Sequence, residues 1–174
     1  MFQSLSRLTI KNRQQMKNLA AEIAAIAQIG DIIGLEGDLG MGKSFFAAAF
    51  INSLLDKKII IPSPTFNLLY SYISNSKGKR KGTSKSKNNN IYHFDLYRIK
   101  NKDELDNIGI RDYLNDGISL IEWPKIAQDL FGKTYLEIII SAGRATQERI
   151  IEFKAGEYWL TKLKKIYLIE KLFS

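Results

Sequence analysis

The chain of 174 residues carries 26 basic and 18 acidic side chains, a net charge of +8, and its 45% hydrophobic content fits one folded globular domain. It has no cysteine, which excludes disulfides, thiolate zinc sites, iron–sulfur clusters and a cysteine nucleophile. No stretch approaches the about 18 uninterrupted apolar residues of a membrane helix, and Met1 to Ile10 lacks a signal-peptide core, so we expect a cytoplasmic protein without membrane contact.

The first elements in chain order are a helix, a strand and a second helix. Residues 12–28 carry apolar side chains at steps of three and four, and Asn12 and Gln15 are spaced as a capping box at the start. The apolar run at 31–36 is too short for a helix and predicts a strand buried on both faces. Residues 44–55 are apolar around most of a helical circumference, which predicts a helix packed against the sheet.

The next segments predict a hairpin with a long tip. Extended segments are expected at 59–61, 66–73 and 91–99. Residues 75–90 contain no large apolar side chain and cannot become ordered by burial, so we expect them to form a mobile hairpin tip. Six basic residues and no acid lie between Lys77 and Lys87, so without them the charge of +8 falls by 6 to +2.

The rest of the chain alternates short helices and strands. Helical segments are predicted at 102–107, 111–114, 124–130 and, more loosely, 158–173, and strands at 118–121, 135–141 and 148–154. We expect one domain over residues 1–155, with 156–174 as a helical extension of it.

The clearest motif is Gly-Asp-Leu-Gly-Met-Gly-Lys-Ser at residues 37–44, which matches GxxxxGK[ST] between a predicted buried strand and a predicted helix. Such a loop turns its backbone N–H groups inward and, with the helix N-terminus, binds a polyphosphate. Lys43 would reach the β and γ phosphates, and the Ser44 hydroxyl would bind Mg²⁺. The alternative is a glycine-rich turn that binds nothing.

A magnesium–nucleotide site also needs an acid at the carboxyl end of a neighbouring strand. Glu122 follows the predicted strand 118–121, and Asp95 lies on the same face of its strand as His93. The alternatives are a capping or surface role for Glu122 and a solvated position or an Arg98 pair for Asp95. His93 is a general base, a switch or a satisfied structural residue.

Thr65, in Ser-Pro-Thr-Phe, is placed either to sense the γ phosphate with its hydroxyl or to form an ordinary proline turn. Tyr97 and Arg98 either support the site or a partner surface, or only pack and pair at the surface.

The motifs GDLGMGKS, SPTF, HFDLYR, IGIRDYL and LIEWP, in this order and in a chain of this size, resemble the TsaE family. These are small P-loop ATPases of bacterial tRNA threonylcarbamoyladenosine synthesis, and the resemblance covers about residues 10–155. It implies a three-layer α/β P-loop NTPase fold with a mostly parallel central sheet plus antiparallel strands. Residues 75–90 and the chain beyond Ala155 fall outside the family pattern.

The resemblance implies a Mg²⁺-dependent ATPase that is slow alone and does not itself transfer the threonylcarbamoyl group. It would act with TsaB and TsaD to modify adenosine 37 of tRNAs that read codons beginning with A, by driving turnover of their complex. The resemblance assigns ATP or ADP binding to Gly37, Asp38, Leu39, Gly40, Met41, Gly42, Lys43, Ser44, Phe45 and Lys125, the metal to Ser44 and Glu122, and hydrolysis to Lys43, Asp95 and Thr65. Ser44 replaces the commoner threonine and keeps the hydroxyl ligand.

Two other functions compete with this one. A small-molecule kinase would use Asp95 as base and Arg98 on the transferred phosphate, but the helical lid candidate at 101–114 holds only one arginine, Arg111. A nucleic-acid-binding protein would bind tRNA phosphates through the basic run from Lys77 to Lys87, which is otherwise a solvated tip. In the ATPase hypothesis, tRNA is reached through the complex, with at most weak direct contact by that run.

Overall fold

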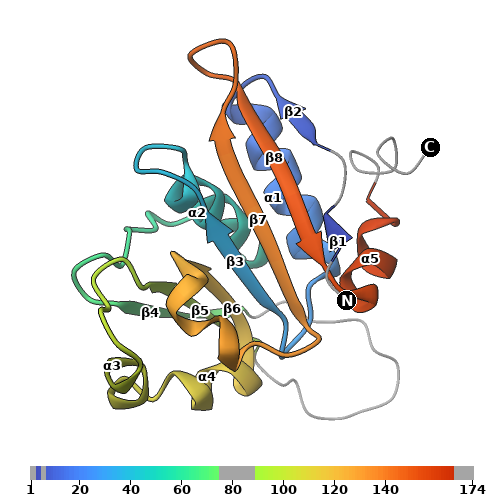
Figure 1. Ribbon diagram of the computed structural model, residues 1–174. Coiled ribbons are helices and arrows are strands. Elements are labelled where there is room, and N and C mark those ends of the chain that lie inside the picture. The colour runs from blue at the N-terminus through green and yellow to red at the C-terminus, as the bar shows by residue number, and fades with distance from the viewer. Residues whose placement is uncertain (1–2, 5–6, 75–88, 167–174) are drawn as a thin grey trace, which may run out of the picture.

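The computed structural model describes residues 3–4, 7–74 and 89–166, and it shows a sheet covered by helices on both faces (Figure 1). The sheet has eight strands in the order β1-β8-β7-β3-β6-β5-β4, with β2 also paired to β8. The strands are β1 (Gln3–Ser4), β2 (Leu8–Ile10), β3 (Ile32–Glu36), β4 (Leu69–Ser74), β5 (Asn89–Asp95), β6 (Gly117–Glu122), β7 (Tyr135–Ala142) and β8 (Arg149–Ala155). The helices are α1 (Arg13–Ile26), α2 (Lys43–Leu54), α3 (Lys102–Asn107), α4 (Ile110–Asp116), the 3₁₀ helix η1 (Pro124–Leu130) and α5 (Glu157–Leu163).

The centre of the sheet is parallel: β3 lies between β7 and β6, and β6 pairs with β5. The edges are antiparallel, with β8 on β7 and β4 on β5. Side chains alternate across the sheet, so that Ile33 and Leu35 pack on the α1 and α2 face while Ile32 packs on the face covered by α3, α4 and η1. The predicted three-layer α/β class is confirmed.

The start of α1 follows its predicted cap. Asn12 Oδ1 accepts a hydrogen bond of 3.0 Å from the Gln15 N–H. Gln15 Oε1 accepts a hydrogen bond of 2.7 Å from the Lys11 N–H. In a standard capping box it would accept from the N–H of Asn12, so the reciprocal contact lies one residue earlier here.

Residues 59–61, where an extended segment is predicted, form no strand. The Asn52 side chain on α2, in place of a neighbouring strand, hydrogen-bonds to both backbone groups of Ile59. Its Oδ1 accepts from the Ile59 N–H at 2.9 Å, and its Nδ2 donates to the Ile59 carbonyl at 3.0 Å. The strand predicted from residue 66 begins only at Leu69, because the Leu68 N–H bonds back to the Pro64 carbonyl in a turn. The strand predicted to reach residue 99 ends at Asp95, and the Leu96 N–H bonds to the Glu122 carbonyl.

The predicted hairpin is confirmed, with register from Leu69 opposite Phe94 to Ser74 opposite Asn89. The predicted tip was two residues too long, because Asn89 and Asn90 belong to β5. Residues 75–88, with the whole basic run, lie outside the described residues.

The segment 124–130 is helical with Pro124 in its first turn, as predicted, but its turns are 3₁₀. The C-terminal helix is shorter than predicted and ends at Leu163, and residues 167–174 lie outside the described part. Trp159, Leu160 and Leu163 of α5 join the core beside α1. Within the described residues no helix has both the length and the apolarity to cross a membrane.

Candidate nucleotide and magnesium site

The glycine-rich loop connects β3 to α2, as the sequence predicted (Figure 1). Gly37 has φ +141°, and a Cβ there would lie 2.2 Å from the Ile140 carbonyl oxygen on β7, so only glycine lets the loop cross its neighbour. Gly42 caps α2 with φ +105°. The first backbone N–H groups of this twelve-residue helix therefore face the loop and make it an anion-binding end.

Lys43 is buried and turned back onto its own loop. Its Nζ donates to the carbonyl oxygens of Gly37 at 2.6 Å and Asp38 at 3.0 Å, and lies 3.8 Å from the centroid of the Trp123 ring. Burial lowers the pKa of Lys43, and nearby carboxylates, with Glu122 first among them, oppose that shift. The lysine charge thus sits beside the cradle and is held by weak acceptors that a phosphate could replace.

Ser44 and Glu122 meet at this end of the sheet. Glu122 ends β6, is 2% exposed, and stands next to Leu35 in the parallel register with β3. The Ser44 hydroxyl donates to Glu122 Oε2 at 2.9 Å. Two hard oxygen atoms therefore converge beside the glycine-rich loop, and a hydroxyl with one carboxylate is a donor set that suits Mg²⁺ carried by nucleotide phosphates. The residues fit the ion that the sequence predicted.

Asp95 and Thr65, far apart in sequence, are directly bonded. The Thr65 hydroxyl donates to Asp95 Oδ2 at 2.5 Å, and the Tyr97 N–H donates to Asp95 Oδ1 at 3.0 Å. Ser63, which sequence reasoning missed, links this pair to Ser44, with its Oγ 2.9 Å from Thr65 Oγ1 and 3.4 Å from Ser44 Oγ. The signal for Ser63 was its place in the Ser-Pro-Thr-Phe motif.

Other predicted residues lie around this centre. His93 is fully buried, with Nε2 2.9 Å from Glu122 Oε1, a contact that the sequence did not reveal. Lys125 is exposed, and its Nζ lies 3.0 Å from Oε1 of Glu36, the last residue of β3. Arg98 stacks over Phe66, with its guanidinium 4.4 Å from the ring centroid, and the hydrogen bonds described for Asp95 come from other groups.

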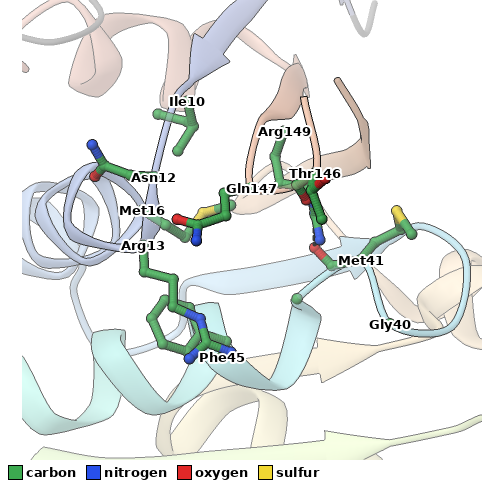
Figure 2. A pocket seen from close by; sticks show the side chains of 11 residues that line it. Ile10, Asn12, Arg13, Met16, Gly40, Met41, Phe45, Thr146, Gln147 and Arg149 are labelled. Carbon is green, nitrogen blue, oxygen red and sulfur yellow. Dashed lines mark hydrogen bonds between the residues drawn. The ribbon is translucent and has the colours of Figure 1, made fainter. Parts of the chain in front are cut away.

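A pocket of about 310 Å³ adjoins the loop on the side of α1 (Figure 2). Arg13 lies along the Phe45 ring at one end, Thr146 and Arg149 lie near Met41 at the other, and Gln147 projects between them. Arg149 Nε donates to the Met41 carbonyl at 3.0 Å and ties the loop to the β7–β8 hairpin. The sequence had not pointed to this pocket, because its walls come from three distant segments. The other residues that line it are Ile10, Asn12, Met16, Gly40 and Gly42.

Asp38, Leu39 and Gly40 form the outer part of the loop, and the Leu39 side chain is 68% exposed. Tyr97 packs against Trp123, with ring centroids 5.0 Å apart. The structure therefore brings Lys43, Ser44, Thr65, Asp95 and Glu122 together, while Lys125 and Leu39 stand at the rim.

The fold and the loop between β3 and α2 define a protein with a P-loop NTPase-like fold. Within that class, residues 10–151 match the family model described as "Threonylcarbamoyl adenosine biosynthesis protein TsaE". The chain belongs to the TsaE family.

Curated relatives support this assignment. A protein of Rickettsia typhi named "tRNA threonylcarbamoyladenosine biosynthesis protein TsaE" is 38% identical over 75% of this chain and 82% of its own length. The Bacillus subtilis protein of the same name is 32% identical over 83% of this chain and 82% of its own length. The crystal structure of Bacillus subtilis YdiB matches with a TM-score of 0.68 and 27% identity, over 95% of both chains.

Proposed function

We propose that the protein is a Mg²⁺-dependent ATPase that takes part in forming the threonylcarbamoyl group on adenosine 37 of tRNAs. The names of its relatives support the pathway. The main support for ATPase activity is that Ser44 Oγ lies 2.9 Å from Glu122 Oε2 beside a glycine-rich loop whose carbonyls accept from the Lys43 ammonium. A glycine-rich turn without a ligand would not need to gather these three groups.

In this proposal the loop amides and the N-terminus of α2 bind the phosphates, and Lys43 exchanges the Gly37 and Asp38 carbonyls for phosphate oxygens. Mg²⁺, when bound, would neutralise charge that develops on the phosphates, held by Ser44 and Glu122. Thr65 and Asp95, already bonded to each other, orient the attacking water. Lys125 and Glu36 stand at the rim as a nucleotide contact and its partner.

The pocket beside α1 takes the nucleoside in this proposal. Its volume of about 310 Å³ lies at the lower end of the range for small-molecule sites, about 300–1,000 Å³. It opens directly onto Gly40, Met41 and Gly42 of the phosphate loop. The Arg13 guanidinium, which lies along the Phe45 ring, offers a flat surface for a base, and Gln147 offers an amide. A nucleotide would thus span the pocket and the loop.

The proposed partners are TsaB and TsaD, with tRNA reached through their complex in the cytoplasm. The test is a reconstituted modification reaction that counts threonylcarbamoyl groups formed per TsaD, with wild-type protein or Lys43→Ala. We expect many turnovers with wild type and about one with the variant, and co-purification with TsaB and TsaD that differs between ATP and ADP. Equal turnover with both proteins, or association indifferent to nucleotide, would contradict the proposal.

A further inference from the structure

His93 occupies an unusual position for a core residue. It lies in β5 with its side chain fully buried, and its Nε2 stands 2.9 Å from Oε1 of Glu122, whose side chain is 3% exposed. In the parallel register His93 is opposite Leu120, two residues before Glu122. Because alternate residues share a face, both side chains point to the α2 side of the sheet, where the loop lies.

Packing alone does not explain a histidine here. Its Nδ1 has no hydrogen-bond partner within the described residues, and a buried nitrogen without a partner is a cost that a leucine would avoid. Glu122 accepts from Ser44 through Oε2, so the carboxylate needs a donor on Oε1, and the Nε2–H of His93 is that donor. What histidine adds over a hydrophobic residue is this single directed N–H.

The two oxygens of Glu122 thus have different partners. Oε1 is held by a side chain fixed in the core, and this leaves Oε2 turned toward Ser44. Groups that hydrogen-bond to a metal-binding carboxylate fix its orientation and tune the affinity of the site. We propose that His93 is a positioning residue that holds Glu122 Oε2 toward Ser44 and thereby strengthens magnesium-dependent nucleotide binding. This inference rests on the proposed function, which assigns Mg²⁺ to Ser44 and Glu122.

Asp95, the last residue of β5, belongs to a separate branch of the network. Its oxygens accept from Thr65 and from the Tyr97 N–H, while the bond described for His93 runs to Glu122. His93 should therefore act on the metal ligands and leave the Asp95–Thr65 pair in place.

The test is calorimetric binding of ADP to the full chain over a series of Mg²⁺ concentrations, and in EDTA. His93→Leu removes the donor, and His93→Gln keeps an N–H at similar reach. We expect His93→Leu to need on the order of 10–100-fold more Mg²⁺ to reach half of the magnesium-dependent gain in affinity. His93→Gln should stay within about 3-fold of wild type, since it keeps that donor. The affinity in EDTA should be the same for all proteins.

Glu122→Gln, alone and combined with His93→Leu, separates the possible outcomes. If His93 acts through Glu122, the leucine adds no further shift in the Glu122→Gln background. An unshifted magnesium dependence in His93→Leu, or the same shift in both backgrounds, overturns the inference. An unshifted dependence in Glu122→Gln overturns the proposed metal site itself. Should His93→Leu not fold, His93→Asn, whose amide is too short to reach Oε1, replaces it, and equal behaviour of Asn and Gln overturns the inference.

Discussion

Both ends of β3 carry a buried acid, but the two acids differ in how many hydrogen-bond partners their oxygens have. Before the strand, Asp31 is fully buried and both its oxygens are used: Oδ1 accepts from the Tyr158 hydroxyl at 2.8 Å, and Oδ2 accepts from Lys162 at 2.6 Å and the Gln28 N–H at 2.7 Å. At the end of the strand, Glu36 pairs with Lys125 through Oε1, but its Oε2 is buried without a partner in the described residues. The hydrogen bonds of the Lys43 ammonium there go to loop carbonyls.

The difference indicates which charges stabilise the fold and which are available for a ligand. A fully bonded buried network fixes structure, since every group has its partner within the chain. The amino end of β3 is of this kind and attaches α5 to the sheet. The carboxyl end gathers a hydroxyl, an ammonium that is held by loop carbonyls, and a Glu36 oxygen that has no partner in the described residues. These groups leave bonding capacity for a charged ligand. Mutations at the two ends should therefore change different properties.

The largest effect is expected at the amino end. Lys162→Met leaves the Asp31 carboxylate buried without its cation, and removal of one partner of a buried ion pair costs about 3–5 kcal/mol of unfolding free energy. Urea unfolding measures this loss, with the exposed Lys165→Met as control. Nucleotide affinity, measured well below the unfolding transition, should not change. A stability loss under about 1 kcal/mol would show that Asp31 is held by its other donors.

At the carboxyl end, Lys43→Ala should reduce activity and leave stability unchanged. We expect hydrolysis to fall by about 100- to 1,000-fold, because in the proposed function the ammonium stabilises charge that develops on the phosphates. The melting temperature should not fall, since burial already disfavours the lysine charge, as its lowered pKa shows. Steady-state phosphate release and thermal melts measure the two effects, with the exposed Lys57→Ala as control. A marked loss of stability would make Lys43 a structural residue like Lys162.

Asp95→Asn tests a smaller effect within the site. In the proposed function the carboxylate acts through Thr65 on the attacking water, so kcat should fall by about 10-fold while nucleotide affinity changes by less than about 2-fold. Single-turnover hydrolysis and calorimetric binding separate the two quantities, with the exposed Asp56→Asn as control. A loss of affinity with unchanged kcat would place Asp95 in nucleotide binding instead.

The smallest effect concerns Tyr158, whose pKa is raised to about 12 by burial and by its hydrogen bond to Asp31. Tyr158→Phe should cost about 1 kcal/mol at neutral pH, the usual contribution of one hydrogen bond. A raised tyrosine pKa adds stability that is complete below pH 10 and lost as the pH rises through about 12. The difference between wild type and variant should therefore narrow from pH 10 to 12, as followed by urea unfolding. If the difference in unfolding free energy stayed constant over this pH range, it would contradict the hydrogen bond between Tyr158 and Asp31.

Local pattern predicted most of the fold, because strand 31–36, the glycine loop and helix 44–55 carry their periodicity and turn chemistry within a few residues of each other. The local pattern failed where a contact with another element determines the structure of the segment. The Asn52 side chain bonds to both backbone groups of Ile59, and the short strands β1 and β2 pair with the distant strand β8.

The candidate site divides in the same way. Lys43, Ser44 and Glu122 follow from a motif and from strand ends, so the sequence could place them together. The bond between His93 and Glu122, the Asp31–Lys162 pair and the pocket between α1 and the β7–β8 hairpin join segments far apart in the chain. Such contacts depend on strand order and register, which no local pattern contains.

Calorimetric titration of the wild-type chain with ATP or ADP in the presence of Mg²⁺ tests most directly whether the carboxyl end of β3 holds a nucleotide. We predict saturable binding with one nucleotide per chain that weakens in EDTA and is lost in Lys43→Ala. The account would be contradicted if folded wild-type protein bound neither nucleotide. It would also be contradicted if both nucleotides bound equally well with and without Mg²⁺, and equally well to wild type and Lys43→Ala.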